Sequence, residues 1–174
     1  LFPEFYSDQQ IGERIESVKE LLGDVVYAVE GLDASASVDL LTVIDRLMHL
    51  NQHSLVMIES ISYGLLAQAC FAYSWLTQAT LLHPQAYSEG ELLRYRDALR
   101  HQYPEAMCLT QICQYSLEEI ADPNQTITMR ISLYTSSSDF HKDVVLAGSL
   151  NYKQQQAATL TLDFLRRYLS NLCL

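Results

Sequence analysis

Three carboxylates on one predicted helix are the residues whose type and spacing could support metal chemistry. Glu16, Glu20 and Asp24 follow one another at intervals of four, so they share one face of a helix predicted over 10–30. Carboxylate oxygens are ligands that Mg²⁺ prefers, and bound Mg²⁺ can promote phosphodiester hydrolysis. A line of acids is also typical of a solvated helix face, and the pattern favours that interpretation over a metal site.

Histidine and cysteine give no stronger indication of a site. His49 and His53 stand four residues apart, but the sequence places no third metal ligand beside them. The four cysteines form no Cys-x-x-Cys pair and favour buried thiols in a reducing compartment. The sequence contains no nucleophile elbow and no phosphate-binding glycine loop. We therefore expect no catalytic residue, no metal and no cofactor.

The net charge of −10 comes entirely from the first part of the chain. After residue 124 the sequence has five Lys or Arg and three Asp, and before it six basic and eighteen acidic residues. An acidic surface repels phosphate backbones, and affinity for nucleic acids depends on several Lys or Arg contacts with phosphates. Autonomous RNA binding is therefore not expected outside the C-terminal segment. The longest weakly charged run, 61–84, contains polar residues throughout, which argues against a membrane span.

The elements that position these residues are predicted to be mostly helical. With 49% hydrophobic residues, six Gly and four Pro, long helices are favoured over a fold with many tight turns. Apolar periodicity predicts helices over 10–30, 38–50, 54–82 (continuous or broken near Gly64), 92–100, 105–120 and 152–172. Apolar and polar residues alternate over 126–133, which predicts a strand with 142–147 as its antiparallel partner. The expected fold is mainly α with a small C-terminal antiparallel β-hairpin (α+β), divided into domains at 1–122 and 123–174.

Three segments resemble parts of ribonuclease III proteins. Leu22 to Gly31 is similar to the metal-binding helix of Dicer-like members, roughly L-G-D-V-V-E-A-V-x-G, with Tyr27 where the family has its catalytic glutamate. His83 to Leu99 resembles the segment after the first catalytic helix, through Glu89-Gly90-Glu91-Leu92 and the residues that follow. Val144 to Leu165 looks like the last strand and helix of a double-stranded-RNA-binding domain, but of its lysine cluster only Lys153 remains.

The departures from the family pattern imply a degenerate site on a ribonuclease III-like helical core. The resemblance places acids at Asp24, Tyr27 and Gln68, and only Asp24 is an acid. Hydrolysis with two metal ions needs more carboxylates than this, so the resemblance implies a pseudoenzyme. The candidate interface residues are Trp75, Tyr73, Leu92 and Leu165.

We interpret the chain as a non-catalytic scaffold or heterodimer partner in an RNA-processing or ribonucleoprotein complex. Its expected partners are proteins in a hetero-oligomeric complex, with RNA at most indirect and no membrane. Its expected location is intracellular, in the cytoplasm or an organellar matrix, and it is not expected to be secreted. Two alternatives remain open. One is an acidic helical adaptor or secretion chaperone that binds a partner peptide, with the hairpin edge available for β-augmentation; the other is an active Mg²⁺ nuclease that uses Glu20 and Asp24.

Overall fold

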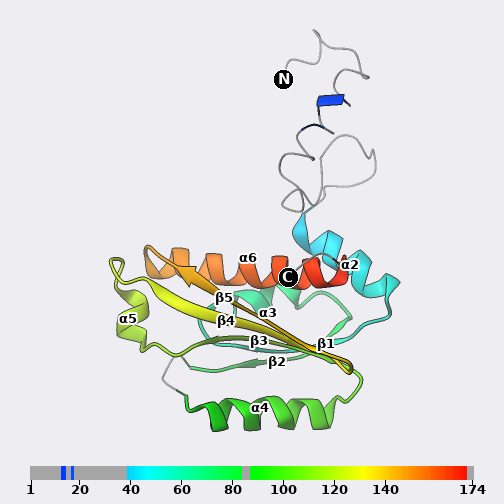
Figure 1. The fold of residues 1–174 in the computed structure, drawn as a ribbon, viewed down its shortest axis with the longest axis horizontal. Helices are drawn as coiled ribbons and strands as arrows, with labels where there is room; N and C mark the ends of the chain where they lie inside the picture. Colours follow the sequence, from blue (N-terminus) through cyan, green and yellow to red (C-terminus); the bar gives the residue numbers. More distant parts are fainter. Residues whose placement is uncertain (1–12, 15–16, 18–38, 84–86, 172–174) are drawn as a thin grey trace. The chain divides into compact units, whose positions relative to one another are not determined.

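The chain forms two compact units, Leu1–Asp39 and Leu40–Leu174. The computed structural model describes residues 13, 14, 17, 39–83 and 87–171 (Figure 1). Glu13, Arg14 and Ser17 are helical. The rest of the helix predicted over 10–30, with Glu20, Asp24 and Tyr27, lies outside the described residues.

The second unit is built on a five-stranded mixed sheet in the order β2-β1-β3-β4-β5. The parallel strands are β1 (Leu55–Glu59), β2 (Leu76–Leu81) and β3 (Met107–Cys113). β4 (Ile127–Tyr134) pairs antiparallel with β3, and β5 (Asp139–Leu146) pairs antiparallel with β4. The expectation of a mainly helical fold with an isolated hairpin is therefore wrong, because the hairpin is two strands of a larger α/β sheet.

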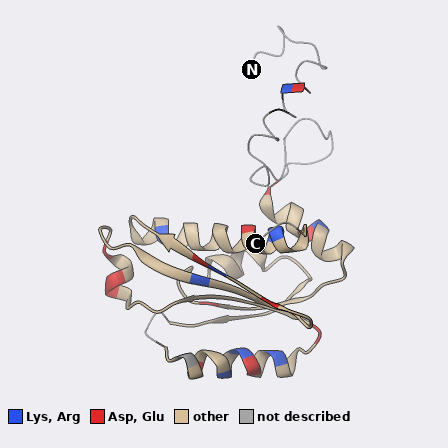
Figure 2. Cartoon of the chain, viewed as in Figure 1, with Lys and Arg blue, Asp and Glu red and all other residues tan. Residues whose placement is uncertain are grey.

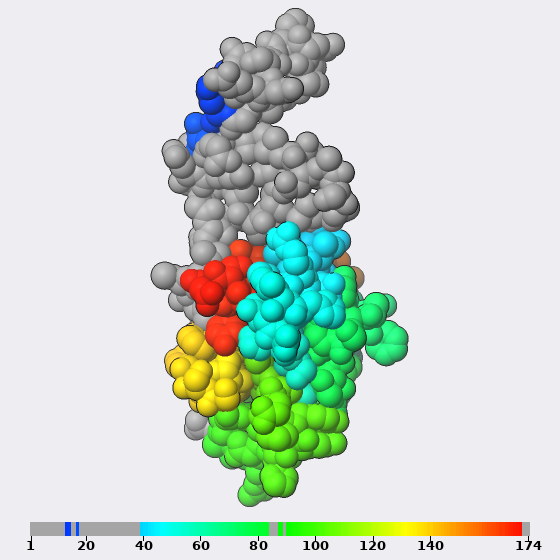
Figure 3. Space-filling view, turned by 90° about the vertical axis from the view of Figure 1, so that its right-hand side faces the viewer, coloured from blue at the N-terminus to red at the C-terminus, as the bar shows by residue number. Residues whose placement is uncertain are grey.

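Helices cover both faces of this sheet. α3 (Leu65–Cys70) connects β1 to β2, and α4 (Glu89–Gln102) leads from β2 back past β1 to β3. Right-handed crossovers that step in opposite directions place their helices on opposite faces. Accordingly, α3 shares a face with α2 (Leu40–Leu50) and α6 (Leu150–Leu169), and α4 lies on the other face (Figure 1). The end of α6 lies beside α2 (Figure 3), and α5 (Leu117–Ala121) packs on α6.

Alternation along β4 explains why the two faces differ. Its odd-numbered residues Ile127, Met129, Ile131 and Leu133 are buried in the core under α6. Its even-numbered residues, Thr128 to Tyr134, face the side of α4 together with Asp143 of β5. The α6 face of β4 is thus apolar and closed, whereas the α4 face is polar and partly open.

The helices predicted over 54–82 and 105–120 are wrong, for one physical reason. β1 is buried at all five residues and β3 at all but one, so both strands are mostly apolar and lack the polar–apolar alternation of a half-buried strand. Such a run resembles a buried helix when it is followed by the short helix α3 or α5. The predicted helices at 38–50, 92–100 and 152–172 and both hairpin strands are confirmed, with shifted ends.

Candidate functional site

The carboxyl edge of β1 and β3 is the first place to look for a site, because parallel α/β sheets bind ligands there. Glu59, at the end of β1, is fully buried. Its Oε1 accepts a hydrogen bond from the Ala67 backbone N–H at 3.0 Å, and its Oε2 accepts one from the Leu66 N–H at 3.3 Å. Ser62 Oγ also donates to Oε2. The carboxylate therefore binds the first turn of α3 from inside the protein.

Gln111 of β3 continues this network toward α6. Its side-chain Oε1 accepts from the Ser62 backbone N–H at 3.2 Å and lies 2.8 Å from Ser62 Oγ. Its Nε2 donates to Thr161 Oγ1 of α6 at 3.4 Å, and Thr161 in turn donates to the Ala157 carbonyl at 2.7 Å. These contacts join β1, β3 and α6 through groups that have no exposure to water.

The hydroxyl groups at this edge are occupied and inaccessible. Ser60 Oγ donates to the Gln111 carbonyl at 3.2 Å and accepts from the Cys113 N–H at 3.1 Å. Ser60 is 1% exposed and Ser62 is fully buried. Within the described residues, every buried side-chain nitrogen and oxygen has a hydrogen-bond partner. A nucleophile needs access to its substrate, so these serines hold the backbone and do not face a ligand.

The backbone after this network turns sharply through two left-handed residues. Tyr63 has φ 56° and Gly64 has φ 93°, and a Cβ at Gly64 would come within 3.2 Å of Leu81 Cδ2. A left-handed conformation costs a residue with a side chain about 1–2 kcal/mol, so the network must hold Tyr63 in place. The Tyr63 hydroxyl lies 3.4 Å from His83 Nε2, beside a cavity of about 230 Å³.

A larger groove lies on the other face of the sheet, between α4 and the open half of that face. Its volume is about 490 Å³, within the range of small-molecule sites. The floor is apolar and comes from β1, β3 and α4: Ile58, Ile112, Leu92 and Leu93. The remaining lining residues are polar, aromatic or charged: Thr110, Gln114, Tyr115, Thr128, Ser132, Tyr134, Arg96, Arg130 and Asp143.

Two arginines give the groove its charge. The guanidinium of Arg96 lies 4.8 Å from the centre of the Tyr134 ring, and it donates to Asp97 Oδ1 at 2.7 and 2.9 Å. Burial alone would lower the pKa of Arg96, but hydrogen bonds with Asp97 and Tyr134 outweigh it and raise that pKa. Arg130 pairs across the strands with Asp143 through two hydrogen bonds of 2.7 and 2.8 Å, which lower the pKa of Asp143.

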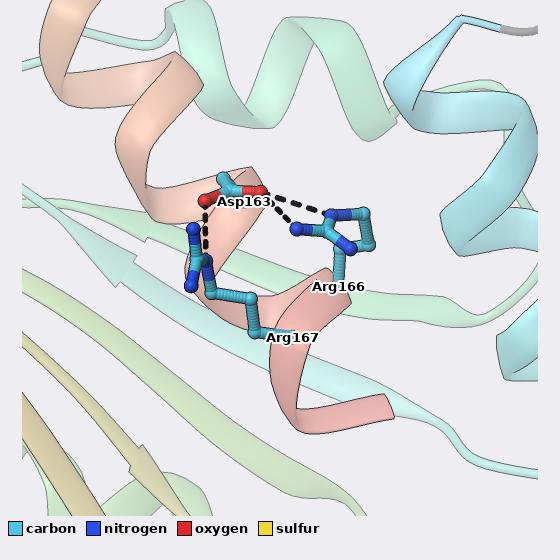
Figure 4. A network of polar contacts seen from close by, with 3 residues as sticks. All are labelled: Asp163, Arg166 and Arg167. Atoms are coloured by element: carbon cyan, nitrogen blue, oxygen red, sulfur yellow. Dashed lines mark hydrogen bonds and ion pairs between the residues drawn. The ribbon is translucent and has the colours of Figure 1, made fainter. Parts of the chain in front are cut away.

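Three basic residues of the C-terminal segment, Lys153, Arg166 and Arg167, are held by hydrogen bonds within the protein. Lys153 is fully buried, and its Nζ donates to the carbonyls of Ile120 at 2.9 Å and Asp122 at 2.7 Å, which caps the end of α5. Asp163 accepts from Arg166 at 2.8 Å and from Arg167 at 2.8 Å (Figure 4). The one lysine carried over from the RNA-binding-domain pattern is therefore a core residue and does not reach a phosphate.

The residues singled out from the sequence do not form one site. Gln68 is exposed on α3. Trp75 is 3% exposed, stacks on Tyr73 and donates through Nε1 to Asp45 at 2.9 Å, while Leu165 is fully buried under the sheet. Leu92 lines the groove. No three His, Cys, Asp or Glu side chains gather as metal ligands in the described part of the chain.

The buried carboxylate and the groove are absent from the sequence-based predictions. Glu59 and Gln111 are brought together by the pairing of β1 with β3, which no local pattern reveals. A carboxylate directly after four apolar residues was the one available signal, because a buried acid needs a partner. Arg96 and Arg130 come from α4 and β4, and only the fold brings them to the lining of one groove.

No protein-family profile matches the chain, and no curated protein matches it. Solved structures do match. A competence or damage-inducible protein from Enterobacter asburiae superposes with a TM-score of 0.59 at 12% identity, over 75% of this chain and 96% of that one. A CinA superfamily protein from Klebsiella pneumoniae gives 0.56 at 14% identity, over 76% and 96%. The competence/damage inducible protein CihA from Agrobacterium tumefaciens gives 0.53 at 10% identity, over 79% and 98%.

These likenesses establish the fold, an α/β domain of the kind seen in CinA-type proteins. They overturn the ribonuclease III resemblance, together with the RNA-binding-domain-like tail and the scaffold function derived from them. The acidic helical adaptor is not supported either, because the chain is not a helical fold. Among the described residues, no helix has the length and apolar character needed to cross a bilayer.

Proposed function

We propose that this chain binds a small organic anion with a ring-sized apolar body in the groove between α4 and the sheet, and that it catalyses no reaction on it. The observation that carries the proposal is the groove itself, about 490 Å³ with an apolar floor and two arginines. Small-molecule sites combine largely apolar walls with a few well-placed polar groups. The apolar body would rest on the floor between Ile58 and Leu92.

The charge of the ligand follows from the arginines. Arg96 is held over Tyr134 and its side chain is 21% exposed, so its fork is positioned before any ligand arrives. A guanidinium has five N–H donors. Arg96 uses two of them on Asp97 and also bonds to Tyr134, which leaves donors for a carboxylate or phosphate. Among the described residues that line the groove, Asp143 is the one acid, and it is bound to Arg130. A cationic ligand would meet two guanidinium groups and is disfavoured.

The absence of catalysis is part of the proposal. The described residues that line the groove include no cysteine or histidine, and Asp143 is held by Arg130 through two hydrogen bonds, which supports a binding role over a catalytic one. The hydroxyls at the carboxyl edge are buried and hydrogen-bonded. The solved structures are described as competence or damage-inducible proteins, and at 10–14% identity no residue role carries over from them. We further propose a reducing, intracellular location, which the free buried thiols of Cys70, Cys108 and Cys113 support.

Ligand-observed NMR with the anions phenyl phosphate and benzoate tests the proposal. Benzylamine, which is cationic, and benzamide, which is uncharged, are the comparison compounds. We expect the two anions to bind and the other two to bind at least tenfold more weakly, a difference of about 1.4 kcal/mol. Arg96→Met should weaken phenyl phosphate binding about tenfold through loss of the charged fork. Leu93→Trp should block the groove, since Leu93 lines it and is 40% exposed.

Arg94→Met is the matched control, because Arg94 is exposed on the same helix and does not line the groove. It should leave binding unchanged while removing the same charge. Binding that neither Arg96→Met nor Leu93→Trp alters would place the ligand elsewhere and refute the proposal. So would the absence of binding by both anions.

A further inference from the structure

The two edges of the sheet differ in a way that bears on assembly. β5 forms one edge and carries Asp139, Lys142 and Asp143, the kind of charged residues that prevent an edge strand from pairing with another chain. β2 forms the other edge, with the sequence Leu-Thr-Gln-Ala-Thr-Leu and no charge. In the part of the chain that the structure describes, β2 pairs only with β1. Its outer edge therefore presents backbone groups without the usual protection.

The surroundings of β2 are also uncharged and partly apolar. Between Glu59 and Glu89 the sequence has no Asp, Glu, Lys or Arg, although 18% of the chain is charged. Figure 2 shows α3 and β2 without the blue and red that mark α4 and β5. Four large hydrophobic residues of this segment are exposed: Tyr63 at 48%, Leu65 at 37%, Phe71 at 85% and Leu81 at 56%. No residue of β2 is fully buried, unlike those of β1.

We propose that two copies of this chain associate through antiparallel pairing of their β2 strands, which joins their sheets into one ten-stranded sheet around a two-fold axis. A second copy is the occupant that the charges favour. Two chains of net charge −10 repel each other, and the repulsion is weakest where the facing surfaces carry no charge, as at the β2 edge. A basic partner would gain no ion pair there, whereas an identical neutral strand completes the backbone hydrogen bonds of both edges.

Strand geometry limits the register of this pairing. Residues directly opposite each other in antiparallel strands point to the same face, so a two-fold axis normal to the sheet must pass through a residue pair and not between residues. The shift in pairing with β1 falls before Gln78, and the strand is regular from Gln78 to Leu81. The axis therefore fits best at Ala79, which would face Ala79 of the second copy. Gln78 would then face Thr80 of the second copy, a pair without charge or steric crowding.

The axis also brings the two copies together outside the strands. It places the same sheet face of both copies on the same side, so that the two α3 helices lie on one side and the two α4 helices on the other. The amino end of one β2 then lies beside the carboxyl end of the other. The start of β2 in the second copy would therefore cover the exposed side chain of Leu81 and the neighbouring Tyr63.

Sedimentation velocity of the full chain across about 5–200 µM tests the pairing, since dimerisation depends on concentration. We expect a species of twice 19.8 kDa. Thr77→Lys and Leu81→Lys each place a charge on the β2 edge and should weaken the dimer at least tenfold. Val145→Lys is the matched control, because Val145 is 68% exposed on the opposite edge strand and adds the same charge. It should leave the dimer intact.

Hydrogen exchange provides a second measurement that needs no variant. The amides of β2 should exchange at least tenfold more slowly in concentrated than in dilute solution, while the β5 amides do not change. A monomer at every concentration would overturn the proposal, as would a dimer that survives both β2 substitutions with β2 exchange unaffected by concentration. Phenyl phosphate binding is measured in the groove on α4, so its failure and the failure of the dimer are distinguishable.

Discussion

Replacement of Glu59 tests whether the buried carboxylate holds the end of β1 to the start of α3. Glu59→Leu removes the acceptor of two backbone N–H groups, on the buried Leu66 and the partly buried Ala67. An unsatisfied buried donor costs about 1–3 kcal/mol, so the two together should lower the free energy of unfolding by about 2–6 kcal/mol. Ser62 loses less, because Gln111 Oε1 remains as its acceptor at 2.8 Å.

Glu59→Gln should lower the free energy of unfolding much less, because the amide can both donate and accept hydrogen bonds at this position. Ser62 Oγ has one proton but lies against two acceptors, Glu59 Oε2 and Gln111 Oε1. An amide at position 59 could donate to Ser62 Oγ, which would then donate to Gln111, while the amide oxygen still accepts from Ala67 N–H. Only the Leu66 N–H would lose its acceptor, so we expect a loss of about 1–2 kcal/mol.

Urea unfolding followed by fluorescence of Trp75, the one tryptophan, measures both losses. With a slope of about 2 kcal/mol per molar urea, Glu59→Leu should lower the midpoint by about 2 M and Glu59→Gln by less than about 1 M. Glu105→Leu and Glu105→Gln are controls at an exposed position and should change stability by less than about 0.5 kcal/mol. Equal losses for the two substitutions of Glu59, or a loss below about 1 kcal/mol for Leu, would refute the reasoning.

Four further outcomes follow from other parts of the structure. Lys153→Met should lower the free energy of unfolding by about 2–4 kcal/mol in urea, because it removes the donor to two carbonyls at the end of α5; a change below about 0.5 kcal/mol would contradict the cap. Burial raises the pKa of Asp163, but hydrogen bonds from two arginines outweigh it and leave that pKa below 3.8. The ionised carboxylate therefore stabilises the fold above the unfolded-state pKa, and this stabilisation is lost as pH falls through the lower folded-state pKa. The stability lost in Asp163→Asn should accordingly shrink as pH falls below about 4. Burial raises the pKa of Cys70 to about 12 and that of Cys108 to about 11, so iodoacetamide at about pH 8 should label them only after unfolding. Because Tyr63 has φ 56°, Tyr63→Gly should be more stable than Tyr63→Ala by about 1 kcal/mol, the reverse of the order in ordinary backbone.

The parts of the fold that could be predicted are those whose local pattern matches their burial. α2 and α6 each bury one stripe, and β4 buries alternate residues, so their periods indicate the correct element. β1 and β3 are covered on both faces, and their residues give no period that separates a strand from a helix. Their pairing is a long-range property, and it also decides where Glu59 meets Gln111.

The strongest match to ribonuclease III has a local explanation. Ser88 accepts from the Glu91 N–H at 3.3 Å and Glu91 accepts from the Ser88 N–H at 2.9 Å, a capping box that starts α4. Helices of unrelated proteins begin with the same residue types at the same spacing, because the first N–H groups of any helix need acceptors. The similarity of Glu89-Gly90-Glu91-Leu92 to the family segment therefore indicates the start of a helix and carries no information about a nuclease site.

The need of the first N–H groups of a helix for acceptors also distinguishes the carboxyl edge of the sheet from the groove on the α4 face. At the carboxyl edge, where an α/β sheet commonly binds an anion, the first turn of α3 already holds the carboxylate of Glu59. A ligand anion would have to displace a buried charge that is bonded to the backbone, which would leave that charge without partners. On the α4 face, by contrast, hydrogen-bond donors remain available to a ligand. Arg96 has donors beyond those that contact Asp97 and Tyr134, and it lies above an apolar floor. The anion site that we propose for a protein of net charge −10 therefore lies in the groove on the α4 face, and not at the first turn of α3.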